Sequence, residues 1–173
     1  MRFLFCLLIA SFATGTLVAQ NSVDQFFNQY AGVEHINQLN LQGSLLQFVA
    51  NIEDDKKTKN TITKLHKLSA LWIEDFNPIA QQDVKRLRKN LQKDYFEPLI
   101  MVKEGDSNVN LWIQENEGNI TGVVLLIDGS DNFLLINLAG KLKFEDLGDI
   151  DVDIEGMDYF KKLPKKRSDL KRA

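Results

Sequence analysis

The stretch LIMVKEGDSNVNLWIQENEGNITGVVLLIDGSDNFLLINL, residues 99–138, decides the fold. Within it, apolar side chains either alternate with polar ones or form short unbroken runs in four segments, a pattern typical of half-buried and fully buried strands. Short connections around Gly105, Gly118 and Gly129 separate these segments, and glycine supplies the positive φ that tight hairpins need. Such loops leave no room for helical crossovers, so the stretch predicts a four-stranded antiparallel meander.

The residues before the meander show alternating periodicities. Ser22 is placed to cap a short amphipathic helix that has Gln25 at its third position. Residues 33–41 read as an extended segment, and residues 65–73 read as a strand buried on both sides. Between these two segments, helical spacing is shown by Leu45, Phe48, Val49 and Ile52.

A longer helix is predicted after the second strand, and a polar loop before it. Asn77 and Pro78 form a helix start, because proline's fixed dihedral angle and missing amide proton cost nothing at the first helical position. Pro98 ends this helix. Residues 53–60 are charged or polar without an apolar face, so they predict a surface loop. The helix that starts at Asn77 has one apolar stripe, which consists of Ala80, Val84, Leu87, Leu91 and Tyr95.

The order of these elements predicts the architecture. Helices early and strands late favour the α+β class, with an antiparallel sheet made of the meander and one or two earlier strands. We expect helices to pack on one face of this sheet. Residues 20–160 are long enough to bury one core without disulfides, so they predict a single domain followed by a basic tail over residues 161–173.

The first nineteen residues read as an export signal. A basic start is followed by an apolar run and then small residues, which predicts cleavage between Ala19 and Gln20 and a periplasmic or secreted protein. An uncleaved amino-terminal anchor is the alternative. The sole cysteine, Cys6, lies in the apolar run without the residues that precede a lipid-modified cysteine. The processed chain is therefore expected to carry neither a disulfide nor a lipid.

Several segments resemble a bacterial envelope family catalogued as domain of unknown function 4252. They are DQFFNQY from Asp24, YFEPLIMV from Tyr95, VNLWI from Val109, and residues 123–141. The likeness covers about residues 22–150. It implies an exported α+β domain of Gram-negative bacteria, often encoded near genes for extracytoplasmic sigma factors, with no assigned catalytic residues. Many members look like lipoproteins, and the absence of a suitable cysteine departs from that pattern.

The strongest metal-site candidate is an acidic segment. Seven carboxylates lie between Glu145 and Asp158 without a basic partner among them. A calcium loop starting at Asp149 would need glycine at Ile154 and glutamate at Phe160, so the register fails. A solvated, alternating strand is the alternative interpretation. His35 and His66 are the only imidazoles, and two lysines flank His66. The weak metal candidates are Asp149, Asp151, Asp153 and Glu155.

The sign of the charge inverts after the acidic segment. The basic residues of the tail are candidates for contact with an anionic membrane surface, where each charge contributes about 1 kcal/mol. A solvated tail, or one folded back on the acidic segment, is the alternative. These residues are Lys161, Lys162, Lys165, Lys166, Arg167, Lys171 and Arg172.

The sequence carries no catalytic motif that we can assign. It has no nucleophile elbow and no zinc-protease motif, and Ser44 is interpreted as a helix-capping hydroxyl. The paired acids Glu53 with Asp54 and Glu74 with Asp75 lie on predicted loops, not in a cleft. The formal charge of −3 does not favour nucleic acid.

We therefore predict a non-enzymatic interaction module of the cell envelope, with an unidentified envelope protein as partner and no cofactor. A signalling or homeostatic role is implied by the resemblance alone. Two alternatives remain: a small-ligand-binding or hydrolytic domain with a pocket between sheet and helices, and divalent-cation binding by residues 145–158.

Overall fold

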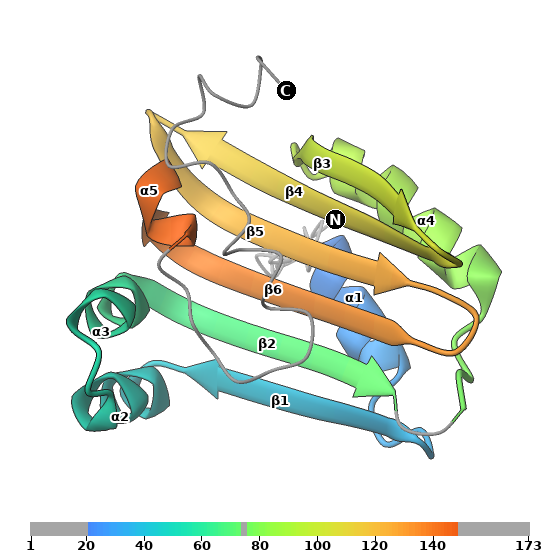
Figure 1. The fold of residues 1–173 in the computed structure, drawn as a ribbon, viewed down its shortest axis with the longest axis horizontal. Helices are drawn as coiled ribbons and strands as arrows, with labels where there is room; N and C mark the ends of the chain where they lie inside the picture. Colours follow the sequence, from blue (N-terminus) through green and yellow to red (C-terminus); the bar gives the residue numbers. More distant parts are fainter. Residues whose placement is uncertain (1–20, 74–75, 149–173) are drawn as a thin grey trace, which may run out of the picture.

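The computed structural model describes residues 21–73 and 76–148 as a six-stranded antiparallel sheet with five helices (Figure 1). The strands lie in the order β1-β2-β6-β5-β4-β3. In chain order the elements are α1 (Ser22–Gln29), β1 (Ile36–Gln42), α2 (Ser44–Ile52), α3 (Lys56–Thr63), β2 (Leu65–Ile73), α4 (Gln81–Lys93), β3 (Glu97–Glu104), β4 (Ser107–Asn116), β5 (Asn119–Asp128), β6 (Phe133–Leu142) and α5 (Phe144–Leu147).

The predicted meander is confirmed. Strands β3 to β6 follow one another in the chain and pair as antiparallel neighbours. Gly105 and Gly118 adopt positive φ values of 59° and 76° in the first two connections, as tight turns require. The two earlier strands complete the sheet, because β2 pairs with β6 and β1 pairs with β2. The α+β class predicted from the order of elements is therefore correct.

The strand register aligns apolar side chains in straight rows. Because alternate residues of a strand face the same side, each row contributes to one face of the sheet. Side chains from α2, α3 and α5 join this face in one buried cluster. One row crosses β4, β5, β6, β2 and β1 through Leu111, Leu125, Ile136, Ala70 and Leu39, and the next through Ile113, Val123, Leu138, Leu68 and Leu41.

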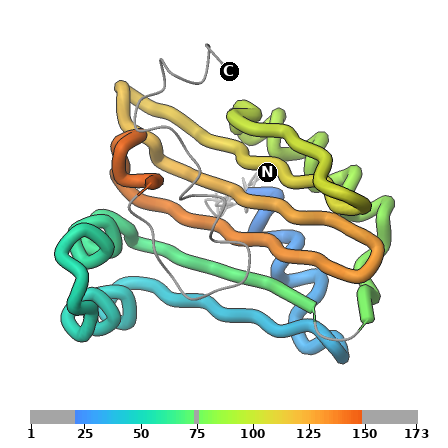
Figure 2. The backbone as a smooth tube through the Cα atoms, in the orientation of Figure 1, coloured from blue at the N-terminus to red at the C-terminus, as the bar shows by residue number. Residues whose placement is uncertain are grey.

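The opposite face packs against α1 and α4, which lie on the same side of the sheet (Figures 1 and 2). Leu126, Leu135 and Leu71 form the middle of this face. Their helical partners include Phe26 of α1 and Leu87 of α4. Helices thus pack on one face as predicted, whereas α2, α3 and α5 contribute to the cluster on the other.

The start and end of α4 differ from the prediction. The helix begins at Gln81, and Asn77 instead forms a turn in which its side-chain carbonyl accepts the Ile79 amide at 3.0 Å. Tyr95 lies outside the helix and is 83% exposed, because its φ of 63° turns the chain away from the helical path. Phe96 takes the buried position, and its amide donates to the Leu91 carbonyl at 2.9 Å, as in a helix-terminating loop.

The surface loop predicted for residues 53–60 is wrong, because most of it belongs to α3. Asp55 caps this helix by accepting the Thr58 amide at 2.8 Å. The buried side of α3 consists of Thr58, Thr61 and Ile62, so two threonines take the place of the apolar residues on which the periodicity argument relied. The helix is stabilised by its cap and by packing against α2 and β2, which local sequence does not reveal.

Candidate binding surface

Within the described part of the chain, the residues predicted from the sequence as site candidates do not come together in one place. The metal candidates at residues 149, 151, 153 and 155 and the basic residues of 161–173 lie outside the described residues, as do Glu74 and Asp75. Across residues 21–73 and 76–148, no group of three or more histidine, cysteine or acidic side chains is placed to hold a metal ion. His66 is exposed on β2, and Glu53 and Asp54 lie in the α2–α3 connection.

Helix α2 presents large apolar side chains to solvent. Leu45, Phe48 and Ile52 are 55%, 62% and 64% exposed. Their spacing of three and four residues puts them on one stripe. The buried side of the helix is formed by Leu46 and Ala50 instead. Ser44 does not cap the helix as predicted, because it is the first helical residue and Gly43 holds the N-cap position without a side-chain bond.

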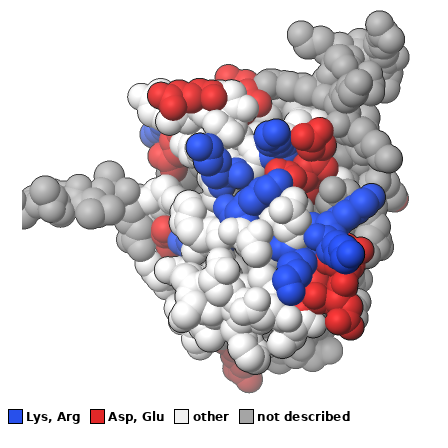
Figure 3. All heavy atoms as spheres, turned by 90° about the vertical axis from the view of Figure 1, so that its left-hand side faces the viewer, with Lys and Arg blue, Asp and Glu red and all other residues white. Residues whose placement is uncertain are grey.

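The stripe borders an uncharged area on one side. Figure 3 views the end of the molecule that carries α2, α3 and α5, and its lower part, where α2 lies, shows a broad surface without charged side chains. Lysines and acidic side chains gather above this area and to its right. No charged residue occurs in residues 36–52, although 26% of the chain is charged. The stripe therefore continues into an uncharged strand, β1.

Strand β1 is an edge of the sheet, and among the described residues no strand pairs with its outer side. Its sequence, INQLNLQ, contains neither proline nor a charged residue. The other edge, β3, carries Pro98, three charged side chains and a register shift next to the proline. Such features are the usual means by which proteins prevent strand addition at an edge. Only β3 of the two edges is protected in this way.

More exposed apolar side chains lie where β1 begins. Val33 is exposed just before the strand. Phe76 is 60% exposed, and its ring contacts His35 edge-on with a centroid separation of 6.0 Å. Together with the α2 stripe, five of the eight large apolar residues exposed in the described chain lie at the two ends of β1. We call the outer side of β1, the α2 stripe, Val33 and Phe76 the β1–α2 surface.

The signal that could have identified this surface is the composition of α2. The apolar side of this helix is unusually wide, spanning about 200° of the helix, with only Ser44, Gln47 and Asn51 on the polar side. The apolar residues are Leu45, Leu46, Phe48, Val49, Ala50 and Ile52. A short helix beside a sheet can bury only part of such a side, so the rest must be exposed or covered by a partner.

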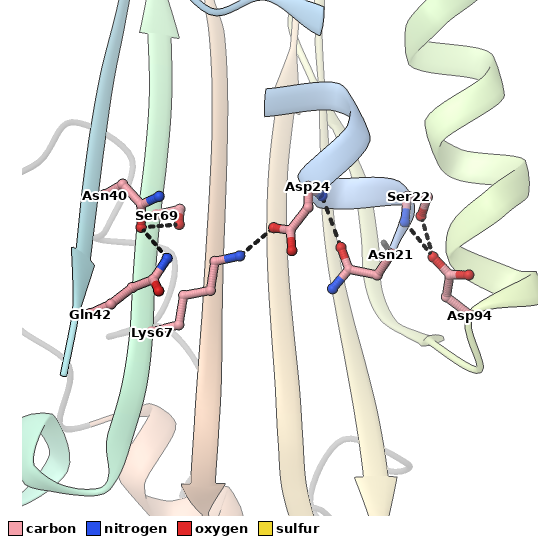
Figure 4. Close-up of polar contacts among 8 residues, drawn as sticks. All are labelled: Asn21, Ser22, Asp24, Asn40, Gln42, Lys67, Ser69 and Asp94. Carbon is pink, nitrogen blue, oxygen red and sulfur yellow. Dashed lines mark hydrogen bonds and ion pairs between the residues drawn. The ribbon is translucent and has the colours of Figure 1, made fainter. Parts of the chain in front are cut away.

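A polar network fastens the start of α1 to the sheet and to α4 (Figure 4). Asp24 of α1 forms an ion pair with Lys67 of β2. The amide and hydroxyl of Ser22 donate to one oxygen of Asp94 at 2.7 and 2.5 Å. Asn21, not the predicted Ser22, caps the helix by accepting the Asp24 amide at 2.8 Å. The processed chain predicted from sequence would therefore begin at Gln20, two residues before the first residue of this anchored helix.

Beside Asp24 and Lys67, uncharged side chains continue the network toward the sheet edge (Figure 4). The side-chain oxygen of Asn40 accepts a hydrogen bond from Gln42 at 3.0 Å and one from Ser69 at 3.2 Å. These contacts help to hold the edge strand β1 against β2, and no charged side chain takes part in them.

The end of α1 and the start of α4 share a second polar cluster. The Tyr30 hydroxyl donates to Asp83 Oδ2 at 2.7 Å and accepts the Ala80 amide at 3.1 Å. The hydrogen bond from Tyr30 is the main cause that lowers the pKa of Asp83 below 3.8, and Gln29 and Arg86 act in the same direction against desolvation. Burial raises the pKa of Tyr30, and its bond to Asp83 adds to this rise.

Replacing Tyr30 with phenylalanine should make stability less dependent on acid pH. The lowered pKa of Asp83 means that its ionised form stabilises the fold above about pH 4, and that this contribution disappears as the pH falls through the lower folded-state pKa. Tyr30→Phe should cost about 1–3 kcal/mol at pH 7 and clearly less at pH 2. Urea denaturation at both pH values measures this, and an equal loss at both would contradict the role assigned to Asp83.

Comparison with known proteins supplies a family and no described activity. A family model described as "Domain of unknown function (DUF4252)" matches residues 30–150, well over half of the chain. No curated protein and no solved structure matches. Within the described residues, no helix is long and apolar enough to cross a membrane.

Proposed function

The chain belongs to the family described as domain of unknown function (DUF4252), and from this premise we propose that it is an exported, non-enzymatic interaction module of the cell envelope. The proposal is that it binds its partner through the β1–α2 surface. Export is supported by the leader pattern of residues 1–19, and the interaction role by the exposed stripe of α2.

The observation that carries this proposal is the exposure of Leu45, Phe48 and Ile52 on a helix that the sheet already covers on its other side. Isolated apolar side chains on a surface are ordinary, but a contiguous stripe next to an uncharged edge strand marks an interaction site. The stripe is well ordered by its neighbours, because Leu46 and Ala50 anchor the same helix in the core. A surface held in place in this way loses little conformational entropy when it binds.

The test is cysteine labelling in cells that export the protein. Once residues 1–19 are removed, the chain has no cysteine, so Leu45→Cys introduces a single thiol into the stripe. Cysteine behaves as a small apolar residue and should preserve the surface. Tyr95→Cys is the matched control, because Tyr95 is exposed and lies between α4 and β3, and β3 is the edge of the sheet opposite β1. We expect a maleimide to label the Leu45→Cys protein about tenfold more slowly than the control in cells, and both equally after denaturation.

Equal labelling of the two variants in cells would contradict the proposal, because it would mean that nothing covers the stripe. The amino terminus of the labelled protein, determined by mass spectrometry, checks the premise of export. A terminus at Gln20 is the expected result, and an intact Met1 would contradict removal of the leader.

A further inference from the structure

We propose that the partner of the β1–α2 surface is a second copy of this chain, and that the two β1 strands pair antiparallel about a two-fold axis at Leu39. This inference rests on the proposed function and names its partner. The pairing joins two six-stranded sheets edge to edge into one continuous sheet. A two-fold axis requires that the same surface be complementary to itself, and three observations meet this requirement.

The first observation is the state of the two edges. Strand β1 presents seven residues without proline or charge, whereas β3 carries the features that oppose strand addition. Main-chain groups on the outer side of β1 have no neighbouring strand among the described residues. Addition of another strand would satisfy them, which is the energetic basis of recognition at a sheet edge.

The second observation is the set of residue pairs that an axis at the middle of the strand produces. Leu39 is the middle residue of Ile36–Gln42, so pairing about Leu39 uses the full length of β1. In this register Gln38 of one copy lies opposite Asn40 of the other, and Asn37 lies opposite Leu41. Both amides are exposed. The Asn40 side-chain oxygen already accepts two bonds and Gln38 already donates to the Phe27 carbonyl, so the bond that remains to be made is from the Asn40 amide nitrogen to the Gln38 side-chain oxygen. No pair places like charges together, because β1 has none.

The third observation is the position of the exposed apolar residues. The two strands run antiparallel in this arrangement, so the end of β1 that leads into α2 in one copy lies beside the start of β1 in the other. The α2 stripe of each copy therefore meets the Val33 and Phe76 end of its partner, twice in each dimer. A single arrangement thus brings the two groups of exposed apolar residues at the ends of β1 toward each other. Residues 36–52 lack charge in a chain of net charge −3, so β1 and α2 themselves add no like-charge repulsion to this contact.

The first experiment measures association of the processed protein by sedimentation equilibrium from about 1 to 200 µM, a range that exposes concentration-dependent dimers. We expect a monomer–dimer equilibrium. Leu45→Lys combined with Phe48→Lys should weaken it roughly a hundredfold, because lysine would be desolvated opposite apolar side chains. Met101→Lys and Tyr95→Lys alter residues on or near the β3 edge that are at least as exposed as Leu45, and should change it less than about twofold.

The second experiment tests the register with cysteines. Opposite residues in antiparallel strands lie about 4.5–5.5 Å apart between Cα atoms, within disulfide range, and diagonal ones lie about 7–8 Å apart. Proteins carrying Gln38→Cys and Asn40→Cys should therefore form a disulfide-linked dimer when mixed. Each protein oxidised alone should crosslink several-fold less. Circular dichroism of every variant establishes that it is folded.

Three results would overturn the inference: a monomer at every concentration, a dimer unaffected by the α2 lysines, or crosslinking that does not depend on mixing. If the purified protein is monomeric while the Leu45→Cys protein is protected in cells, a different partner covers the surface and the proposed function stands. If labelling is unprotected in cells, the proposed function fails first.

Discussion

Arg88→Met should destabilise the protein by about 3 kcal/mol, the largest effect that we expect from one substitution on the surface of a helix. Arg88 of α4 donates to Asp128 Oδ2 at 3.0 Å, and Gln81 donates to the other oxygen at 3.1 Å. Asp128 ends β5 and is only 3% exposed. Removal of the guanidinium would leave the buried carboxylate with one neutral donor. Stability falls because no positive charge would then offset the cost of keeping this carboxylate away from water.

The size of this effect is limited by the partial exposure of the arginine. Its side chain is 26% exposed, so water screens part of the pair, and we place the loss at the lower end of the range of about 3–5 kcal/mol for buried pairs. Urea denaturation followed by circular dichroism measures it. The matched control is Arg86→Met on the same helix. Arg86 pairs with Asp83 but is 62% exposed, so its loss should stay below about 1 kcal/mol.

A neutral partner should rescue the Arg88→Met variant. Asp128→Asn in that background replaces the unpaired buried charge with an amide of the same shape, and should restore at least about half of the lost stability. Equal losses for Arg88→Met and Arg86→Met, or a rescue that fails, would show that the buried ion pair does not fasten α4 to β5.

Gly140→Ala should destabilise the protein by about 1–3 kcal/mol although it adds one methyl group. A Cβ at Gly140 would lie 2.4 Å from the Lys64 carbonyl oxygen and 2.9 Å from Leu65 Cα. Both atoms belong to the main chain where β2 enters the sheet beside β6. The next residue also donates its amide to the Lys64 oxygen at 3.0 Å, so neither strand can move aside without losing this bond. Backbone proximity, not a turn, explains the glycine.

Gly148→Ala is the control for this prediction. It adds the same methyl group six residues after the end of β6, where the nearest contact of a Cβ is the Glu145 carbonyl oxygen at 3.9 Å. The φ of −75° suits alanine. We expect a change within about 0.5 kcal/mol. Thermal unfolding of both variants measures the difference, and a Gly140→Ala protein as stable as the Gly148→Ala protein would contradict the close approach of β2 and β6.

Local periodicity was sufficient to predict the sheet but not the sides of the helices. The alternation in residues 99–138 yields four strands because period two and glycine turns are local properties. The spacing of Leu45, Phe48 and Ile52 likewise yields a helix. It does not reveal that Leu46 and Ala50 face the core, because the apolar side of the helix is wider than the sheet can cover and its orientation depends on where β1 and β2 place it. The β1–α2 surface could not be predicted for that reason.

The polar contacts between distant elements could not be predicted from the sequence for a related reason. Arg88 and Asp128 are 40 residues apart, and Tyr30 and Asp83 are 53 apart. Neither pair has a spacing that relates its members, so only the packing of α1 and α4 on the sheet brings them together. The predicted metal and membrane-contact residues lie outside the described chain and stay predictions.

By itself the sequence determined the class of the fold, the meander, the uncharged stretch of residues 36–52 and the expectation of a cleaved leader, since each depends on neighbouring residues alone. Tertiary structure alone decided that β1 is an unprotected edge, that the α2 stripe faces outward and that both meet in one surface. The physical reason is that the exposure of a side chain depends on which elements pack against it in the folded sheet. Periodicity along the chain does not contain that information.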